Sequence, residues 1–169
     1  MAGALLLATG CGWTGEDDGA VPVAPCRQAA AERRPIEGFG EIAIRLTSAA
    51  GKATEACVLL ADDEAARSQG LMGQADLRGY DGMLFRYDEP GRTRFLMRDT
   101  LIPLTVAFYA ADGRFVSAVD MTPCPAETVE CPRYEAGGPY LHALEVPVGG
   151  LERLGGGPGS TLSFPPAEG

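Results

Sequence analysis

The sequence predicts a mainly β, α+β domain: a compact antiparallel-rich sheet or barrel-like domain with one substantial helix at about residues 62–70. Short segments of alternating apolar and polar residues recur between residues 40 and 164, and this period of two is typical of strands. Glycine and proline separate these segments. A single clear segment combines an acidic start with a glycine at its end, as helices do.

The first two strands are expected to form a hairpin. Ile42, Ile44 and Leu46 alternate with smaller or polar residues, which predicts a half-buried strand. Residues 48–52 are predicted to form the turn, and residues 54–61 the second strand.

The helix is expected directly after this hairpin. Asp62 is predicted to cap its N-terminus, and acidic residues occupy the first turn, where they complement the helix dipole. Gly70 is predicted to close its C-terminus.

Strands and loops are expected to make up the rest of the domain. Gly113 suits a hairpin turn, residues 122–138 form a long Pro- and Gly-rich loop, and residues 150–154 form a short helical turn. The later strands are expected at residues 82–87, 93–97, 102–109, 114–121, 140–147 and 160–164.

Length and charge limit the classes of function. The 169 residues are enough for one domain with a real core, which we place at residues 39–165. The formal net charge is -9, and the chain has no basic cluster. Because nucleic-acid binding requires a positive surface, we expect no nucleic-acid partner.

The N-terminus has the character of a processing signal. Residues 1–11 form an apolar run that ends in small residues before Cys11, as in a bacterial lipobox, where the cysteine is lipidated. The run is short and lacks a basic start, which departs from the usual signal. The alternatives are a cleavable signal with an ordinary Cys11 and a frayed terminus. Residues 12–38 are predicted to be a flexible tether. We therefore expect an extracytoplasmic domain that a lipid anchors to the membrane of the bacterial cell envelope, facing the periplasm or the surface.

The cysteines support export. Without Cys11, four of the five cysteines remain, and an even number in an exported chain suggests disulfides, with three possible pairings. Cys124 and Cys131 lie at two rigid Pro-flanked corners of one loop, so we expect this pair, with Cys26–Cys57 as the remainder. Their spacing does not suggest zinc, since His142 is the only histidine.

An ordered set of short motifs resembles the family called domain of unknown function 192. The resemblance covers roughly residues 41–164 and implies a small, mostly β fold that is often exported or lipid-anchored. No biochemical activity is established for the family, so the resemblance implies no reaction. The matching residues are Ala61, Asp62, Arg67, Gly70–Gly73, Gly82–Phe85, Phe95, Met97, Arg98, Thr100, Ile102–Leu104, Phe108, Gly113 and Leu144–Pro147.

This chain departs from the family pattern at two places. Relatives usually have Lys-Asn where this chain has Arg98 and Asp99, and they often have Asp where this chain has Thr105. If the Asp that relatives have at the position of Thr105 carries chemistry, this chain lacks it.

A polar insert between apolar strands is the preferred candidate for a binding site. Arg98 is suited to a carboxylate or phosphate because its guanidinium is a planar fork, Thr100 is a neutral donor, and Arg67 is expected to converge from the helix. Asp99 completes the predicted set. The structural interpretation, which we favour because structural ion pairs are common, pairs Arg98 with Asp99 or Asp81 and lets Thr100 close a turn.

Two other sets of residues are weaker candidates. One set offers the soft ligands that Cu(I) favours and consists of Met72, Met83, Met97 and Met121 with His142. Core packing is the preferred interpretation of these methionines, and we expect no metal or other cofactor. Asp112 and Asp120 are a pair of carboxylates of the kind that glycoside hydrolysis requires, although Asp112 also suits a turn.

We find no nucleophile motif and expect no catalytic residue. The sequence thus favours a non-catalytic binding or accessory module with an envelope protein or glycan as its partner. An enzyme that acts on an envelope polysaccharide and a structural envelope protein are the alternatives.

Overall fold

The structure, a computed structural model, describes Cys26 and residues 33–166. The expected lipobox with Cys11 and most of the expected tether lie outside these residues. None of the helices in the described part of the chain is long and apolar enough to cross a membrane.

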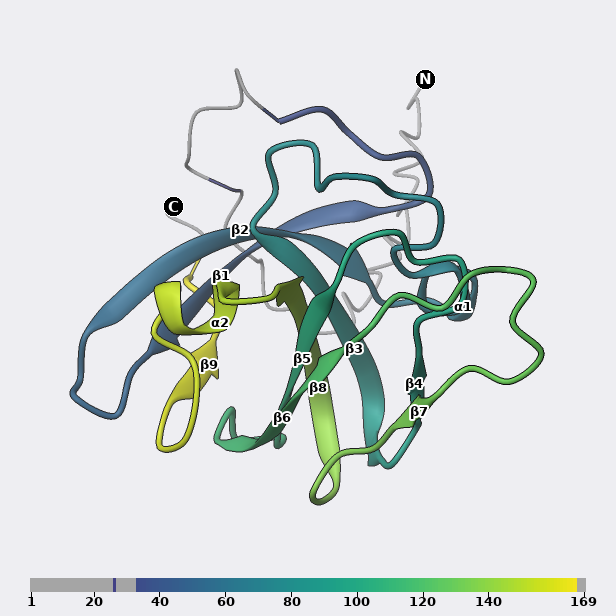
Figure 1. Ribbon diagram of the computed structural model, residues 1–169. Helices are drawn as coiled ribbons and strands as arrows, with labels where there is room; N and C mark the ends of the chain where they lie inside the picture. Colours follow the sequence, from purple (N-terminus) through teal and green to yellow (C-terminus); the bar gives the residue numbers. More distant parts are fainter. Residues whose placement is uncertain (1–25, 27–32, 167–169) are drawn as a thin grey trace, which may run out of the picture.

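The described chain forms a seven-stranded sheet in the order β6-β5-β8-β3-β2-β1-β9, and a separate two-stranded sheet of β4 and β7 (Figure 1). The mainly β fold class is therefore confirmed. The elements are β1 (Gly40–Thr47), β2 (Ala53–Ala61), α1 (Glu64–Gln69), β3 (Gly82–Gly91), β4 (Phe95–Leu96), β5 (Leu104–Tyr109), β6 (Phe115–Met121), β7 (Arg133–Tyr134), β8 (Tyr140–Pro147), α2 (Gly150–Arg153) and β9 (Thr161–Ser163).

The helix α1 lies where the sequence predicts it, but it is short. Its N-cap is Asp63 and not Asp62, because the Asp63 carboxylate accepts a hydrogen bond of 2.8 Å from the backbone of Ala66. Asp62 instead forms an ion pair of 2.8 Å with Arg86 on β3. The expected closure at Gly70 is present, since the Gly70 amide donates to the carbonyl of Ala66. With six residues, α1 is not the substantial helix that the sequence suggested.

Connectivity explains the place of α1 in the fold. β1 and β2 form the expected antiparallel hairpin, but β2 and β3 are parallel neighbours. Parallel strands require a crossover, and α1 with the segment 71–80 provides it. The other pairs in the seven-stranded sheet are antiparallel.

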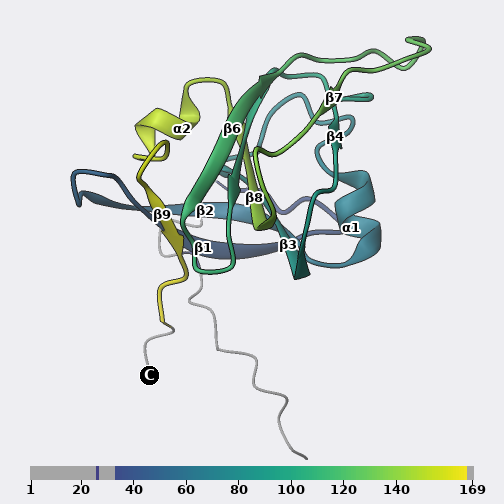
Figure 2. The same ribbon diagram turned by 90° about the horizontal axis from the view of Figure 1, so that it is seen from below.

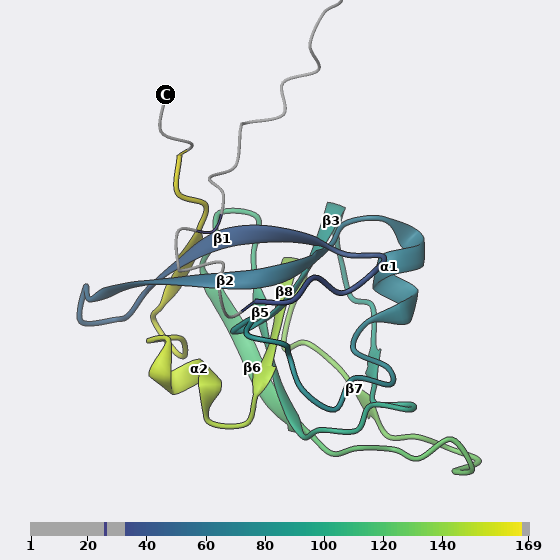
Figure 3. The same cartoon turned by 90° about the horizontal axis from the view of Figure 1, so that it is seen from above.

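The sheet curls until its two ends approach one another. β1 and β2 cross the strands β5 and β8 at a steep angle (Figure 3). The Leu162 amide donates to the Gly113 carbonyl at 2.8 Å, and the Phe115 amide donates to the Ser160 carbonyl at 3.1 Å. Gly113 has φ +78°, and a Cβ atom there would overlap the Leu162 carbonyl oxygen. Glycine at the β5–β6 turn therefore permits the half-barrel.

Each face of the sheet carries its own apolar core. We call the side with Met83, Val106 and Phe108 the first core, and α1, the segment 71–80 and β4 cover it. The second core contains Ile44, Leu144 and Leu162 and lies beneath α2 and β9. Figure 2 shows α1 and the β4–β7 pair on one side of the molecule and α2 on the other.

Two disulfides fasten loops to this frame, and both are the pairs that the sequence analysis expected. Cys26–Cys57 ties the N-terminal segment to β2, and Cys124–Cys131 closes a loop after β6. Residues 33–38 lie against the domain, since Ile36 is buried in the first core and the Arg34 amide donates to the Arg78 carbonyl at 3.0 Å.

Candidate ligand-binding pocket

Three of the four residues predicted for the binding site line one pocket. Arg67, Arg98 and Thr100 meet around a cavity of about 320 Å³, whereas Asp99 does not line it. The walls come from the end of α1 and the residues after it, from β3, from the segment around β4, and from β8. Residues that are far apart in the sequence therefore converge because the crossover through α1 and the small sheet cover the same face.

Arg67 is held across the gap between α1 and β3. Its Nη1 atom donates to the backbone carbonyls of Asp62 at 2.6 Å and Arg86 at 2.9 Å. Its guanidinium lies over the Tyr87 ring, 5.2 Å from the centroid. These contacts fix the direction of the side chain but do not neutralise its charge.

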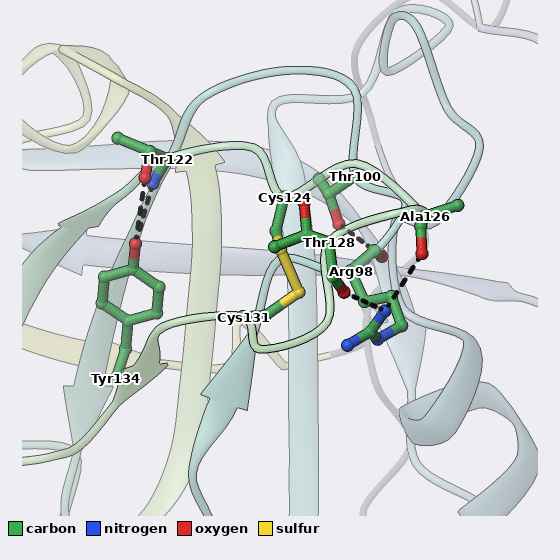
Figure 4. Close-up of a disulfide and its surroundings, with 8 residues drawn as sticks. All are labelled: Arg98, Thr100, Thr122, Cys124, Ala126, Thr128, Cys131 and Tyr134. Atoms are coloured by element: carbon green, nitrogen blue, oxygen red, sulfur yellow. Dashed lines mark hydrogen bonds between the residues drawn. A yellow bond between two sulfur atoms is a disulfide. The ribbon is translucent and has the colours of Figure 1, made fainter.

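Arg98 is held by the disulfide loop. Its Nη1 atom donates to the carbonyls of Thr128 at 3.1 Å and Ala126 at 3.4 Å (Figure 4). The Cys124–Cys131 bridge closes this loop, and the Cys124 amide donates to the Met97 carbonyl at 3.1 Å. The backbone of this loop therefore holds the Arg98 guanidinium in position through two hydrogen bonds.

The structural alternatives for the polar insert are only partly present. Among the described residues Arg98 has no ion pair with Asp99 or Asp81, and the Asp81 carboxylate instead accepts from the Cys57 amide at 2.9 Å. Asp99 adopts φ +53°, and its carbonyl accepts from the Gly73 amide at 2.8 Å. Thr100 is buried, with its hydroxyl 3.4 Å from the Arg98 carbonyl. Asp99 thus shapes the turn, while its neighbours line the pocket.

The structure adds a residue that the sequence analysis did not select for the site. Glu145 on β8 lines the pocket although its exposed fraction is only 4%. It lies opposite Met83 on β3 and Val106 on β5, so its side chain belongs to the face that carries the first core. None of the described residues donates a hydrogen bond to its carboxyl group, and burial raises its pKa to about 8.

A signal for Glu145 is present in the sequence. An acid at the third position of Ala143-Leu144-Glu145-Val146 interrupts an otherwise apolar segment of the strand. A strand with one polar face would show regular alternation, and this segment does not. A lone acid in a continuous apolar run therefore marks a buried ionisable group.

The pocket lining contains more cationic than anionic side chains. Arg94 forms a surface ion pair of 2.7 Å with Glu135, but Arg67 and Arg98 have no carboxylate partner among the residues that the structure describes. Glu145 is the single carboxylic acid among the described lining residues. The pocket therefore presents two guanidinium groups without a carboxylate partner among the described residues and one carboxyl that burial keeps mainly protonated at neutral pH.

A comparison with family models gives one match, to DUF192, whose description reads "Uncharacterized ACR", over residues 45–164. The chain belongs to the DUF192 family. This match confirms the resemblance that the motifs suggested, and it spans the sheet from within β1 onward and every residue that lines the pocket.

Two solved structures are similar to this DUF192 domain. One, from Sinorhizobium meliloti and described as "a putative transcription regulator", is 28% identical with a TM-score of 0.66, and the match covers 77% of this chain and 98% of that one. The other, a protein of unknown function from Novosphingobium aromaticivorans, is 28% identical with a TM-score of 0.67, and the match covers 89% and 99% of the two chains. No curated protein matches.

The methionines and the histidine of the DUF192 domain do not come together. Met83, Met97 and Met121 are buried in the first core, while Met72 is partly exposed at the pocket. His142 packs edge-on against the Phe164 ring beside the second core. Burial and the charge of Arg86 lower the His142 pKa to about 4. The described structure therefore does not assemble the copper ligand set that the sequence analysis considered.

The two candidate carboxylates are also separate. Asp112 forms an ion pair of 2.6 Å with Arg114 in the β5–β6 turn. Asp120, near the far end of β6, accepts a hydrogen bond of 2.7 Å from Thr105. At the rise of a strand, eight residues separate them by on the order of 20 Å, well beyond the spacing that glycoside hydrolysis uses.

A larger hollow of about 660 Å³ lies elsewhere, between the segment 75–80 and residues 102–103 and 147–148. The charged side chains that line it, Arg34, Asp76 and Arg78, are all exposed. Because exposed charges are already solvated, this hollow has less capacity for a specific ligand than the smaller pocket with its buried acid.

Proposed function

We propose that this DUF192 domain is a non-catalytic binding module of the bacterial cell envelope and that its pocket holds a small anionic ligand. One observation carries the proposal: Arg67 and Arg98 line the same cavity, and neither has a carboxylate partner among the described residues. A guanidinium donates in a planar fork that matches carboxylate and phosphate groups. Bracing by backbone carbonyls holds each fork in place before a ligand arrives.

Two features support an extracytoplasmic location. Cys26–Cys57 and Cys124–Cys131 form disulfides, which persist in oxidising compartments outside the cytosol. The apolar run before Cys11 supports a lipid anchor, which would hold the domain at the membrane and present it to an envelope protein or glycan.

The pocket supports binding better than the alternative enzyme. A glycoside hydrolase of the usual kind uses two carboxylates, and the described pocket lining contributes one. A purely structural protein would gain nothing from a buried acid without a hydrogen-bond partner, because an apolar side chain would pack at lower cost.

The net charge of -9 and the lack of a basic cluster speak against a nucleic-acid partner. The description of the Sinorhizobium protein as a regulator therefore does not guide the proposal for this chain.

The proposal is tested by calorimetric titration of the domain with butyrate, caproate and inorganic phosphate. We expect saturable binding of at least one probe, and a loss of at least tenfold in affinity in Arg98→Ala and in Arg67→Gln. Each variant removes one guanidinium group and leaves the other in place. Arg45→Ala is the matched control, since Arg45 lies on β1 in a surface ion pair with Glu55 and does not line the pocket. The proposal is wrong if no probe binds or if both pocket variants bind as well as the control.

A further inference from the structure

The buried acid in the pocket lining has a charge opposite to that of the half-buried arginines beside it. Glu145 is 4% exposed, lines the cavity, and receives no hydrogen bond from a described residue. The groups that face the cavity around it are Tyr87 on β3, Arg67 on α1, and Arg94 and Arg98 beside β4. None of them forms a hydrogen bond or an ion pair with the Glu145 carboxyl, although Tyr87 interacts with it electrostatically.

An unpartnered acid at this place is costly to the domain. Burying a polar group without a partner destabilises a protein, and an apolar residue opposite Met83 and Val106 would avoid that cost. A buried polar group that lacks a partner and faces a cavity is a candidate for ligand binding.

Part of the pocket lining is apolar. Leu71, Phe85 and Phe95 contribute to it from the segment after α1, from β3 and from β4. A ligand that fills the cavity therefore meets guanidinium groups, hydrocarbon and one carboxyl group.

We propose that the pocket binds a zwitterion, namely an organic acid whose anionic group is held by Arg67 and Arg98 and whose ammonium group donates hydrogen bonds to Glu145. The inference rests on the proposed function and deepens it, because it names the class of ligand. An ammonium group satisfies the buried carboxyl with charge-assisted hydrogen bonds, which are stronger than those from a neutral hydroxyl.

Binding of this kind is coupled to proton release. The carboxyl of Glu145 is mainly protonated at pH 7 before a ligand binds, because burial raises its pKa to about 8. Ionising it at pH 7 lowers the affinity by about tenfold. A nearby ammonium group lowers the pKa again, so the carboxyl gives up its proton as the ligand binds.

Matched pairs of probes test the inference. We would titrate the domain with ε-aminocaproate against caproate and with γ-aminobutyrate against butyrate, in two buffers of different ionisation enthalpy. We expect the better amino probe to bind at least tenfold more tightly than its partner and to release close to one proton. Glu145→Gln should abolish the preference and the proton release while retaining binding of the plain acid. γ-Hydroxybutyrate controls for a neutral donor.

The outcomes separate the two proposals. The proposal of a zwitterionic ligand is wrong if the wild-type protein binds the plain acids as tightly as the amino probes, or if no proton is released. The proposal of an anion-binding pocket then still holds. If none of the probes binds, both proposals fail. The wild-type comparison decides the question even if Glu145→Gln does not fold.

Discussion

At the scale of single residues, β8 carries two buried titratable groups on opposite faces. His142 lies beside the second core and Glu145 on the face of the first, because they are an odd number of residues apart in a strand. Burial shifts each group toward its neutral form, so the pKa of His142 falls to about 4 and that of Glu145 rises to about 8. Both shifts therefore make the stability of the fold depend on pH.

The two groups have opposite effects on the free energy of unfolding. Between its ordinary pKa of 4.5 and about 8, Glu145 keeps a proton in the native state that the unfolded chain has lost. Stability therefore falls as pH rises, by about 1.4 kcal/mol per pH unit. Between about 4 and its ordinary 6.5, His142 is protonated only when the chain unfolds, so stability rises with pH. The two slopes cancel up to about pH 6.5, and Glu145 acts alone above it.

We predict that urea unfolding shows a loss of roughly 2 kcal/mol between about pH 6.5 and 8 in the wild-type protein. Glu145→Gln should remove this loss, and His142→Gln should extend it down to about pH 4.5. An unchanged pH profile in Glu145→Gln would contradict the assignment, because that variant cannot titrate.

At the scale of elements, the sequence predicts strands far better than it predicts contacts between distant segments. The hairpin of β1 and β2 follows from local alternation and a local turn, and the structure contains it. β7 has only two residues and exists because Phe95 on β4 pairs with Tyr134, which no local pattern reveals inside a loop. The cap of α1 differs by one residue because Asp62 pairs with Arg86 on β3.

In the candidate site too, residue types could be predicted from the sequence, whereas contacts between distant segments could not. Arg67, Arg98 and Thr100 were predicted from residue type and do line one pocket. Glu145 was not selected, because its significance depends on what lies opposite it in the neighbouring strands. The carbonyl partners of Arg98 come from a disulfide loop about thirty residues later and were equally beyond local reasoning.

The two disulfides should differ in what they contribute. In the chain-entropy model, Cys124–Cys131, with a separation of 7, contributes about 2–3 kcal/mol, and Cys26–Cys57, with a separation of 31, about 4 kcal/mol. Only the shorter loop holds Arg98.

We therefore predict that replacing Cys124 and Cys131 by serine weakens binding of caproate at least fivefold, although it lowers the melting temperature less. Replacing Cys26 and Cys57 by serine should lower the melting temperature more and leave the affinity unchanged. Equal losses of affinity in the two double variants would show that the short loop does not position Arg98.

At the scale of the whole molecule, the curled sheet separates stability from recognition. Its second core is closed by α2, by β9 and by the contact of Gly113 with Leu162. The first core is covered by short elements, α1 and the β4–β7 pair (Figure 2). The pocket is lined by the end of α1 and by residues around β4. Short covering elements leave space that a long helix would fill, and that space is where the two forks and the buried acid converge.

We propose that this space is a ligand site in which Arg67 and Arg98 hold an anionic group of the ligand and Glu145 holds an ammonium group. The most direct test of this proposal is a crystal structure of the domain soaked with ε-aminocaproate. We predict the carboxylate of the probe within hydrogen-bond distance of Arg67 or Arg98, and its ammonium group within hydrogen-bond distance of Glu145. A probe bound in the reverse direction, bound elsewhere, or absent at a concentration that saturates the calorimetric signal would contradict the proposal.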